Sequence, residues 1–418
     1  MAMTQTTDDV RRLIKAGDLP GAVRSLRPHA ETAPLTDLAK ATRYLAEAAG
    51  FGDLARAAKA AARRPDDPRA LYDLGYGCVE HGIAFLAVAP LRRALALVPD
   101  SRRLLQELTS ALEDGHRHAE AAALLAGRGA GLAPWPEQYL LVHNALFAGD
   151  LDTARRTAAA LPDPEDSVWL GARDRQRRIL SRAALAEAAG ALGGQDLRGW
   201  HFALTGGLLA TLSPYGFDAG MTGRYAYLGD SPALCRRGLE RLGLILAAAG
   251  RSPATVSLLP GRSCHVIGLA AAGLLGLPAV PYDPARTDTL VVAYDLNAHD
   301  SGLLSALHGR ADGQVLYEHT TCWTDPPAVT ADVSGLLAQY TAAPWAQQGE
   351  RPAAPRPAEE IARDIVTADP APDEGDGRTP ADPDEALRAF TAAVSAGWLS
   401  GPRDRVRSPG PVRSSRFG

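Results

Sequence analysis

The sequence predicts a protein in two parts: an α-solenoid of helical hairpins followed by a mostly parallel α/β sandwich domain, with a disordered C-terminal tail. Glycine recurs at a nearly fixed interval along the first third of the chain. After residue 200, short apolar runs alternate with helical stretches, and after Trp345 the chain is rich in proline, alanine and acidic residues. Because the chain has 418 residues, it is too long for one ordinary core.

The helical part is predicted by five glycines spaced 33, 32, 33 and 34 residues apart: Gly17, Gly50, Gly82, Gly115 and Gly149. An alanine follows five residues later in four of the five copies, at Ala22, Ala55, Ala87 and Ala154. A period near 34 with small residues at the turn is typical of stacked helical hairpins. Glycine permits the tight turn, and alanine permits close approach of the two helices. One hairpin cannot bury its apolar face alone, so neighbouring hairpins stack.

The best-preserved copy resembles a tetratricopeptide repeat when Pro68 is counted as its first position. The matching landmarks are Leu71, Leu74, Gly75, Cys78, Gly82, Ala87, Leu91, Ala94 and Pro99. The resemblance extends over residues 8–164 and implies an array that binds a protein or peptide partner. We expect the helical pattern of Ser167–Gly190 to cap the array, which gives a first domain of residues 8–194.

Composition narrows the class of protein. The net charge of −4 argues against a nucleic-acid binder, which usually carries a basic stripe. The chain shows no basic start followed by an apolar run and no stretch of about 20 apolar residues, so we expect a cytoplasmic protein without a membrane partner. The four cysteines are far apart and form no CxxC pair, so neither a zinc site nor a disulfide scaffold is predicted.

The second domain, residues 195–348, is predicted to be α/β. Apolar runs indicate strands at Trp200–Thr205, Thr255–Leu259, Thr289–Tyr294 and Gln314–Trp323. Helical patterns lie at Leu234–Gly250, Cys264–Gly276 and Ser301–Gly309. Strands that alternate with helices of about ten residues are typical of a mostly parallel sheet.

The last part of the chain is expected to lack a core. Residues 349–382 are predicted to be a disordered acidic linker, because Arg351–Glu385 holds ten acidic residues and four arginines, a net charge of −6. In the final segment, 383–418, Pro383–Leu399 fits one amphipathic helix. Gly401–Gly418 carries five arginines and one aspartate, and we expect a disordered tail or a weak contact with an acidic partner.

Three loops of the α/β domain are candidate binding sites, because ligands of open parallel sheets bind outside the carboxyl ends of the strands. The third loop, Thr321–Pro327, suits the wall or lid of a pocket, or alternatively its two prolines simply end a strand. The first loop contains Gly261, Arg262, Ser263 and Cys264, between a strand and a helix. Backbone N–H groups at a helix N-terminus suit a phosphate, and the guanidinium of Arg262 would add charge-assisted hydrogen bonds. The alternative is an ordinary strand–helix connection in which Ser263 is the N-cap.

The second loop follows the strongest predicted strand and contains Asp295, Asn297, His299 and Asp300. These groups suit a ribose hydroxyl or Mg²⁺ bound together with a pyrophosphate. The alternative is that Asp300 or Ser301 caps the next helix. No metal site made by the protein alone is predicted.

Ala254–Pro284 followed by Asp288–Leu296 resembles the core of a type I phosphoribosyltransferase. The resemblance implies that the first loop binds pyrophosphate and that Asp295 is the second of a pair of acids. Tyr294 stands at the first acid, and residues 297–300 replace the Thr/Gly-rich loop of that family. It implies a phosphorylated, nucleotide-like ligand.

A hydrolase remains an alternative for the same loop. Gly261–His265 approaches the nucleophile motif G-x-S-x-G, although His265 replaces the final glycine. Ser263 or Cys264 would need a distant histidine such as His299 or His319.

We therefore expect a protein-interaction or scaffold protein. Its array binds a protein partner, and its α/β domain senses a phosphorylated ligand. The alternative is a diverged phosphoribosyltransferase-type enzyme that acts on a substrate recruited by the repeats.

Overall fold

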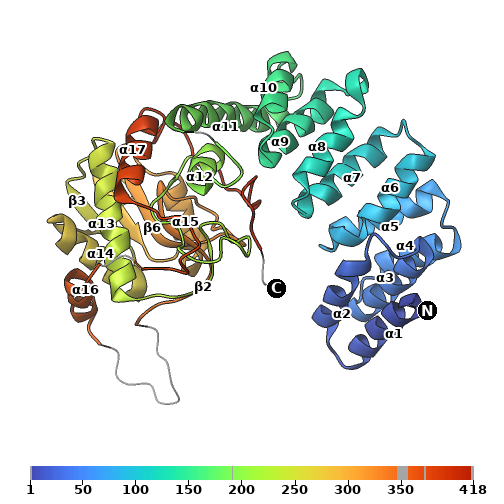
Figure 1. Ribbon diagram of the computed structural model, residues 1–418, viewed down its shortest axis with the longest axis horizontal. Helices are drawn as coiled ribbons and strands as arrows, with labels where there is room; N and C mark the ends of the chain where they lie inside the picture. The colour runs from blue at the N-terminus through green and yellow to red at the C-terminus, as the bar shows by residue number, and fades with distance from the viewer. Residues whose placement is uncertain (1, 191, 346–355, 371–372, 416–418) are drawn as a thin grey trace. The chain divides into compact units, whose positions relative to one another are not determined.

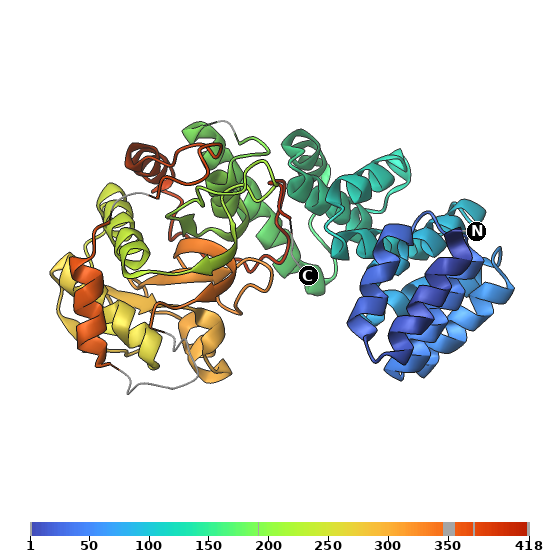
Figure 2. The ribbon, with the colours of Figure 1, turned by 60° about the horizontal axis from the view of Figure 1, so that its bottom comes forward.

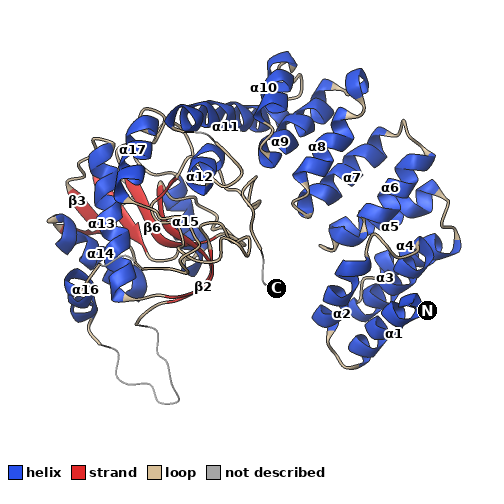
Figure 3. Ribbon diagram, in the orientation of Figure 1, coloured by secondary structure: helices blue, strands red, loops and turns tan. Residues whose placement is uncertain are grey.

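The computed structural model describes residues 2–190, 192–345, 356–370 and 373–415 (Figure 1). It divides into two compact units, Met1–Ser167 and Val168–Gly418, called here the first and the second unit. The first unit is helical, and the strands of the described residues all lie in the second unit (Figure 3). The prediction of a mixed helical and α/β protein is confirmed. The helix expected to cap the array, α11 (Leu170–Ala189), belongs to the second unit, so the division falls earlier than residue 194.

The first unit consists of helices that pack in pairs, each helix also contacting the next along the chain. The pairs are α1 (Ala2–Lys15) with α2 (Leu19–Leu26), α3 (Leu35–Ala49) with α4 (Gly52–Arg63), α5 (Pro68–Glu80) with α6 (Val88–Leu97), α7 (Arg102–Asp114) with α8 (His118–Ala126), and α9 (Tyr139–Ala148) with α10 (Leu151–Ala160). Their core is leucine and alanine, with Ala22, Ala87 and Ala154 completely buried.

The turns inside the five pairs are built alike. In each, an N–H donates to the carbonyl five residues earlier over 2.8–3.0 Å: Asp18 to Leu13, Phe51 to Ala46, Ile83 to Cys78, Arg117 to Leu112 and Asp150 to Ala145. This bond is the mark of a Schellman ending, which requires a left-handed residue just before the donor. In four turns that residue is a predicted glycine, with φ from +72° to +83°.

The fourth turn corrects the predicted glycine register. Gly115 has φ −81°, and the left-handed position belongs to His116, with φ +55°. Counted from His116, the alanine five residues later is Ala121, which is completely buried. The copy that lacked its alanine in the sequence pattern therefore has one, displaced by a single inserted residue.

The second unit is built on an all-parallel sheet in the order β1-β7-β6-β5-β3-β4, with β2 also paired to β7. The strands are β1 (Leu208–Leu209), β2 (Tyr225–Gly229), β3 (Thr255–Leu258), β4 (Ala279–Pro281), β5 (Thr289–Ala293), β6 (Val315–Cys322) and β7 (Val333–Ala342). The central strand β5 is buried along its whole length, as expected for a parallel strand covered on both faces. Helices α13 (Pro232–Ala248) and α14 (Arg262–Leu275) pack together and against the sheet. The short helix α15 (Ser301–His308) joins β5 to β6.

The strand predicted at Trp200–Thr205 is wrong, because these residues belong to helix α12 (Leu197–Thr205). Asp196 caps this helix by accepting a hydrogen bond from the Gly199 N–H, and Gly206, with φ +83°, ends it. All residues of α12 except His201 are buried. A helix buried on nearly every side has no polar face, so its sequence does not show the helical period.

The prediction of a disordered linker over 349–382 is wrong for its described residues. They include helix α16 (Ala358–Thr367), which buries Ile361, Ala362 and Ile365. Figures 1 and 2 show α16 beside α13 and α14, which it contacts. The composition of this segment is dominated by charged residues, so it predicted disorder although its three apolar residues form the buried face of an amphipathic helix. Residues 346–355 and 371–372 lie outside the described residues.

The disordered C-terminal tail is also a wrong prediction. Helix α17 (Asp384–Val394) forms within its predicted range, and the segment 401–415 packs on the second unit. Asp404, only 6% exposed, accepts hydrogen bonds from Arg178 (2.7 Å) and Arg182 (2.9 Å) of α11. Val412 is 1% exposed. Charges that suggested a solvated tail are instead paired with distant residues, which composition does not reveal.

No helix within the described ranges has the length and apolar character needed to cross a bilayer.

Candidate functional site at the carboxyl edge of the sheet

The strand order places a switch point between β3 and β5. After β3 the chain continues to β4 on one side, and then returns to β5 on the other side of β3. The connections that leave β3 and β5 therefore diverge, and a crevice forms outside the carboxyl ends of these strands. Two of the three loops predicted as binding sites, the one at Gly261 and the one at Asp295, begin at this point.

The two loops touch through Cys264 and His299. The Cys264 Sγ lies 3.1 Å from the His299 Nε2 and accepts a hydrogen bond from the Tyr294 N–H over 3.3 Å. Burial raises the pKa of Cys264 to about 11 and lowers the pKa of His299. The pair therefore rests as a neutral thiol beside a neutral imidazole, and a buried thiol of high pKa is a weak nucleophile.

The residues of the first loop have local partners. Gly261, with φ +93°, is the N-cap position of α14, so Ser263 does not have that role. The Ser263 hydroxyl instead accepts a hydrogen bond from the indole N–H of Trp345 over 2.9 Å. The guanidinium of Arg262 is exposed and donates to the carbonyl of Arg356. An arginine held by one exposed carbonyl can turn toward an anion at little cost.

The residues of the second loop divide into two groups. Asp300 caps α15 by accepting the Leu303 N–H over 2.9 Å, which is the alternative considered from the sequence. The Asp295 carboxylate accepts the Asn297 N–H over 2.8 Å, and burial raises its pKa. The Asn297 amide donates to the carbonyl of Asp325 over 2.9 Å, which joins this loop to the loop after β6. Asp295 and Asn297 thus remain at the carboxyl edge, while Asp300 serves the helix.

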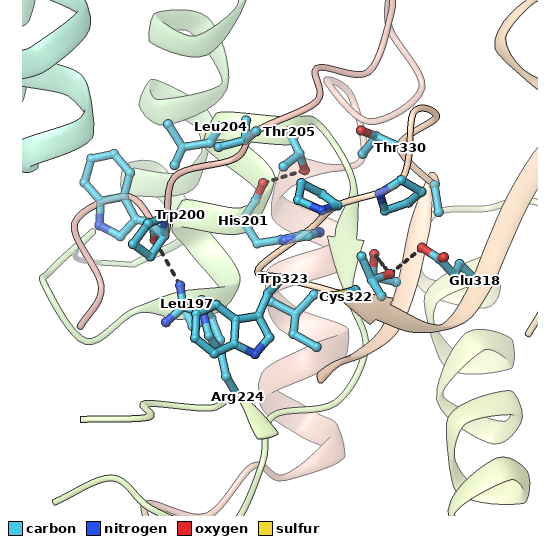
Figure 4. Close-up of a pocket in the computed structure, with 18 of the residues that line it drawn as sticks. Leu197, Trp200, His201, Leu204, Thr205, Arg224, Glu318, Cys322, Trp323 and Thr330 are labelled. Atoms are coloured by element: carbon cyan, nitrogen blue, oxygen red, sulfur yellow. Dashed lines mark hydrogen bonds between the residues drawn. The ribbon is translucent and has the colours of Figure 1, made fainter. Parts of the chain in front are cut away.

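A pocket of about 70 Å³ lies beside the carboxyl end of β6 and the first half of β7 (Figure 4). Its volume is several times the roughly 10–15 Å³ that one water needs. Helix α12, the end of β6, the loop after β6 and the tail around residues 406–409 line it. Figure 4 shows Trp200 and Glu318 at opposite ends of the lining. An apolar wall with a few converging polar groups is typical of a small-molecule site.

Two polar residues of the pocket have unusual surroundings. The His201 Nε2 is buried and has no hydrogen-bond partner among the described residues. Burial lowers the pKa of His201 to about 4, with a further contribution from Arg224, so its imidazole is neutral at pH 7. Arg224 donates to the carbonyls of Pro409 (2.9 Å) and Arg413 (3.1 Å), and this holds the tail beside the pocket.

Glu318 connects the pocket to the switch point. Its Oε1 accepts the N–H of Leu296 from the second loop over 2.7 Å, and its Oε2 accepts the Thr321 hydroxyl over 2.5 Å. The side chain is completely buried, and burial raises its pKa to about 8 despite these two donors. A carboxyl group that titrates near neutral pH is able to give or take a proton from a bound molecule.

Sequence reasoning missed the pocket residues His201 and Glu318, and it did not connect Arg224 with the tail. His201 lies in the helix taken for a strand, and Arg224 orders a tail taken for disordered. Glu318 left a usable signal, because a carboxylate in the middle of an apolar strand has to be hydrogen-bonded or neutral.

No family model, no curated protein and no solved structure matches this chain.

Proposed function

We propose that the first unit is a tetratricopeptide-like solenoid that binds an extended peptide segment of a protein partner. The support is the repetition of one turn, with the same five-residue hydrogen bond, in hairpins that pack in chain order. Hairpins joined in this way expose equivalent positions at a regular spacing, which suits an extended ligand.

The observation that carries this proposal is a set of aromatic side chains at equivalent positions of three of the five hairpins; the fourth hairpin has Gln106 and Ser110 there. The residues six and ten positions before each left-handed residue lie four apart, on one helix face. In the hairpins of α3, α5 and α9 these positions supply the residues called here the tyrosine surface: Tyr44, Tyr72, Tyr76, Tyr139 and His143. All are at least partly exposed, and Tyr76 is 43% exposed. Tyrosine is enriched at protein interfaces because it offers a large apolar area with a polar tip.

The carboxylates near Tyr72 favour a basic partner at that part of the tyrosine surface, whereas Arg11 and Arg43 lie over the ring of Tyr44. On α7, partial burial raises the pKa of both Glu107 and Asp114, and the nearby Glu80 raises that of Glu107 further. The arginine next to Glu107, Arg103, already donates to the Tyr72 hydroxyl over 2.8 Å and lies 4.5 Å above its ring. The carboxylates of Glu80 and Glu107 repel each other, so an incoming cation would stabilise both. A peptide with lysine or arginine therefore complements this surface.

Selection from a random displayed-peptide library against the full chain tests the proposal. We expect enrichment of lysine- or arginine-containing peptides. Tyr76→Ala should weaken binding of the selected peptides by about 10-fold, because tyrosine is among the residues whose truncation costs most at protein interfaces. Val98→Ala, at an apolar residue of the same unit with similar exposure (41%), is the matched control and should leave affinity unchanged. Failure to enrich basic peptides, or equal affinity in Tyr76→Ala, would contradict the proposal.

A second candidate function concerns the carboxyl edge of the second unit. We infer that it binds a phosphorylated, nucleotide-like ligand, because two loops meet at the switch point and one of them leads into the N-terminus of a 14-residue helix. Arg262 would contact the phosphate, and Asp295 a ribose hydroxyl or a bridging Mg²⁺.

Calorimetry with phosphoribosyl pyrophosphate and common nucleotides, with and without Mg²⁺, tests this second candidate. Arg262→Ala and Asp295→Ala should each weaken binding, while Arg388→Ala, at an exposed arginine of the same unit, should not. Release of pyrophosphate on adding a base or amine acceptor would favour the phosphoribosyltransferase-type alternative. If no phosphorylated compound binds, the second candidate function is contradicted.

A further inference from the structure

A buried cluster lies on the face of β6 opposite the pocket. Side chains alternate along a strand, so Glu318 faces the pocket, while His319 faces helix α13. There His319 meets Asp230, which follows β2, and Cys235, from the first turn of α13. The side chains of Asp230 and His319 are 0% exposed, and Cys235 is completely buried.

The three possible ligand atoms have the spacing of a metal site. The Asp230 Oδ2 lies 3.1 Å from the His319 Nε2 and 3.3 Å from the Cys235 Sγ, and the sulfur lies 3.7 Å from the same nitrogen. Bonds of about 2.0–2.3 Å in a tetrahedral zinc site place such atoms about 3.3–3.6 Å apart. The triangle therefore has nearly the dimensions that one bound zinc ion would impose.

Hydrogen bonding alone explains this triangle poorly. Besides His319 and Cys235, the Tyr294 hydroxyl lies 2.8 Å from the same Oδ2 of Asp230. Three donors therefore crowd one carboxylate oxygen, which has only about two lone-pair directions. A cation beside this oxygen would remove the crowding, because the thiol would lose its proton and the His319 Nε2 would offer a lone pair.

The ligand side chains make further hydrogen bonds on the side away from the cluster, as they do in protein metal sites. The His319 Nδ1 lies 3.1 Å from the Tyr317 hydroxyl, which directs the other ring nitrogen to the cluster. The second oxygen of Asp230 accepts the Ser231 N–H over 2.8 Å. Metal-bound histidines and carboxylates usually have such outer hydrogen bonds, which set the ring orientation and tautomer.

We propose that Asp230, Cys235 and His319 bind one Zn²⁺, with the Tyr294 hydroxyl facing the fourth position. One thiolate and one carboxylate cancel the charge of the ion, so the site is neutral, as full burial requires. The mixture of sulfur, nitrogen and oxygen favours zinc over Mg²⁺ or Ca²⁺, which prefer oxygen alone. Binding releases the Cys235 proton to solvent. The ion joins the residue after β2 and helix α13 to β6, and thereby supports the carboxyl edge from the face opposite the pocket.

The test uses the full chain purified from cultures grown in minimal medium with either Zn²⁺ or Co²⁺. We expect about one metal ion per chain by mass spectrometry, as for a structural site. We also expect a thiolate-to-cobalt charge-transfer band in the Co²⁺ form. Cys235→Ser should lose the band, and Asp230→Asn should lower the metal content. Cys78→Ala, a buried cysteine of the first unit, is the matched control and should keep both.

Wild-type protein that contains no more metal than Cys235→Ser and shows no band would overturn the proposal, and the cluster would then be a hydrogen-bond network. If Cys235→Ser does not fold, Cys264→Ser decides the outcome, because Cys264 is the other cysteine that lies beside a histidine in the described residues. If Cys264→Ser retains the charge-transfer band, the band comes from Cys235. If Cys264→Ser loses the band, the metal is bound by the Cys264–His299 pair, which contradicts the assignment.

Discussion

Within each of the two units, the stabilising contacts have a different range in sequence. In the first unit the turn bonds join residues five apart, and each helix packs on its chain neighbours. In the second unit, decisive contacts join residues far apart in sequence, such as Arg182 with Asp404 and Arg198 with Asp382. The parallel sheet adds further distant pairings. The first unit should therefore tolerate local damage, while the second should depend on a few buried ion pairs.

The largest effect is expected from Asp404→Ala. This change leaves the guanidinium of Arg182, 4% exposed, without its carboxylate, and an unpaired buried charge costs about 3–5 kcal/mol. Segment-resolved hydrogen exchange of the full chain should show lower protection throughout the second unit and unchanged protection in the first.

Glu385→Ala is the matched control, because Glu385 pairs with Arg388 but is 81% exposed. It should change stability by less than about 1 kcal/mol. Equal losses in the two variants would show that the tail is not held by its buried pairs.

The next largest effect is a pH dependence that comes from Glu318. Its folded pKa of about 8 lies above the ordinary value near 4.3, so between these pH values the folded state holds a proton that the unfolded state has released. Stability of the second unit should therefore fall as pH rises from about 5 to 8, by up to about 1.4 kcal/mol per pH unit, and then level off. Glu318→Gln should lack this fall in denaturation followed at several pH values. Parallel profiles for the two proteins would rule out a neutral buried Glu318.

A smaller effect is expected at the helix turns of the first unit. Gly82→Ala places a side chain at φ +72° and should cost about 1–2 kcal/mol, whereas Gly115→Ala, at φ −81°, should cost little. Thermal unfolding of the two variants separates the observed register from the one predicted by glycine spacing. A larger loss of stability in Gly115→Ala would indicate that Gly115, as the glycine spacing predicts, is the left-handed residue of the fourth turn.

The smallest effect is a gain. His116→Gly should stabilise the fourth turn by roughly 0.5–1 kcal/mol, because His116 holds a left-handed conformation that glycine adopts without strain. A loss of stability would mean that side-chain contacts of His116 outweigh its backbone strain.

The range of the contacts also explains what the sequence could predict. The period of Gly17, Gly50, Gly82 and Gly149 encodes a local turn, so these turns were predictable. The switch-point loops at Gly261 and Asp295 were predictable because parallel topology follows from the alternation of strands and helices. Arg224, His201 and Asp404 were not, because each depends on a partner more than a hundred residues away or on a helix without a visible period. The cluster of Asp230, Cys235 and His319 comes from three separate elements, so no motif spacing reveals it.

The most direct test of the peptide-binding role is hydrogen exchange of the full chain with and without a basic peptide selected by display. Binding at the tyrosine surface predicts added protection in α3, α5, α7 and α9, and none in the second unit. The same experiment with Tyr76→Ala should show the protection only at a higher peptide concentration. Protection confined to the paired helices α4, α6, α8 and α10, or to the second unit, would contradict the account.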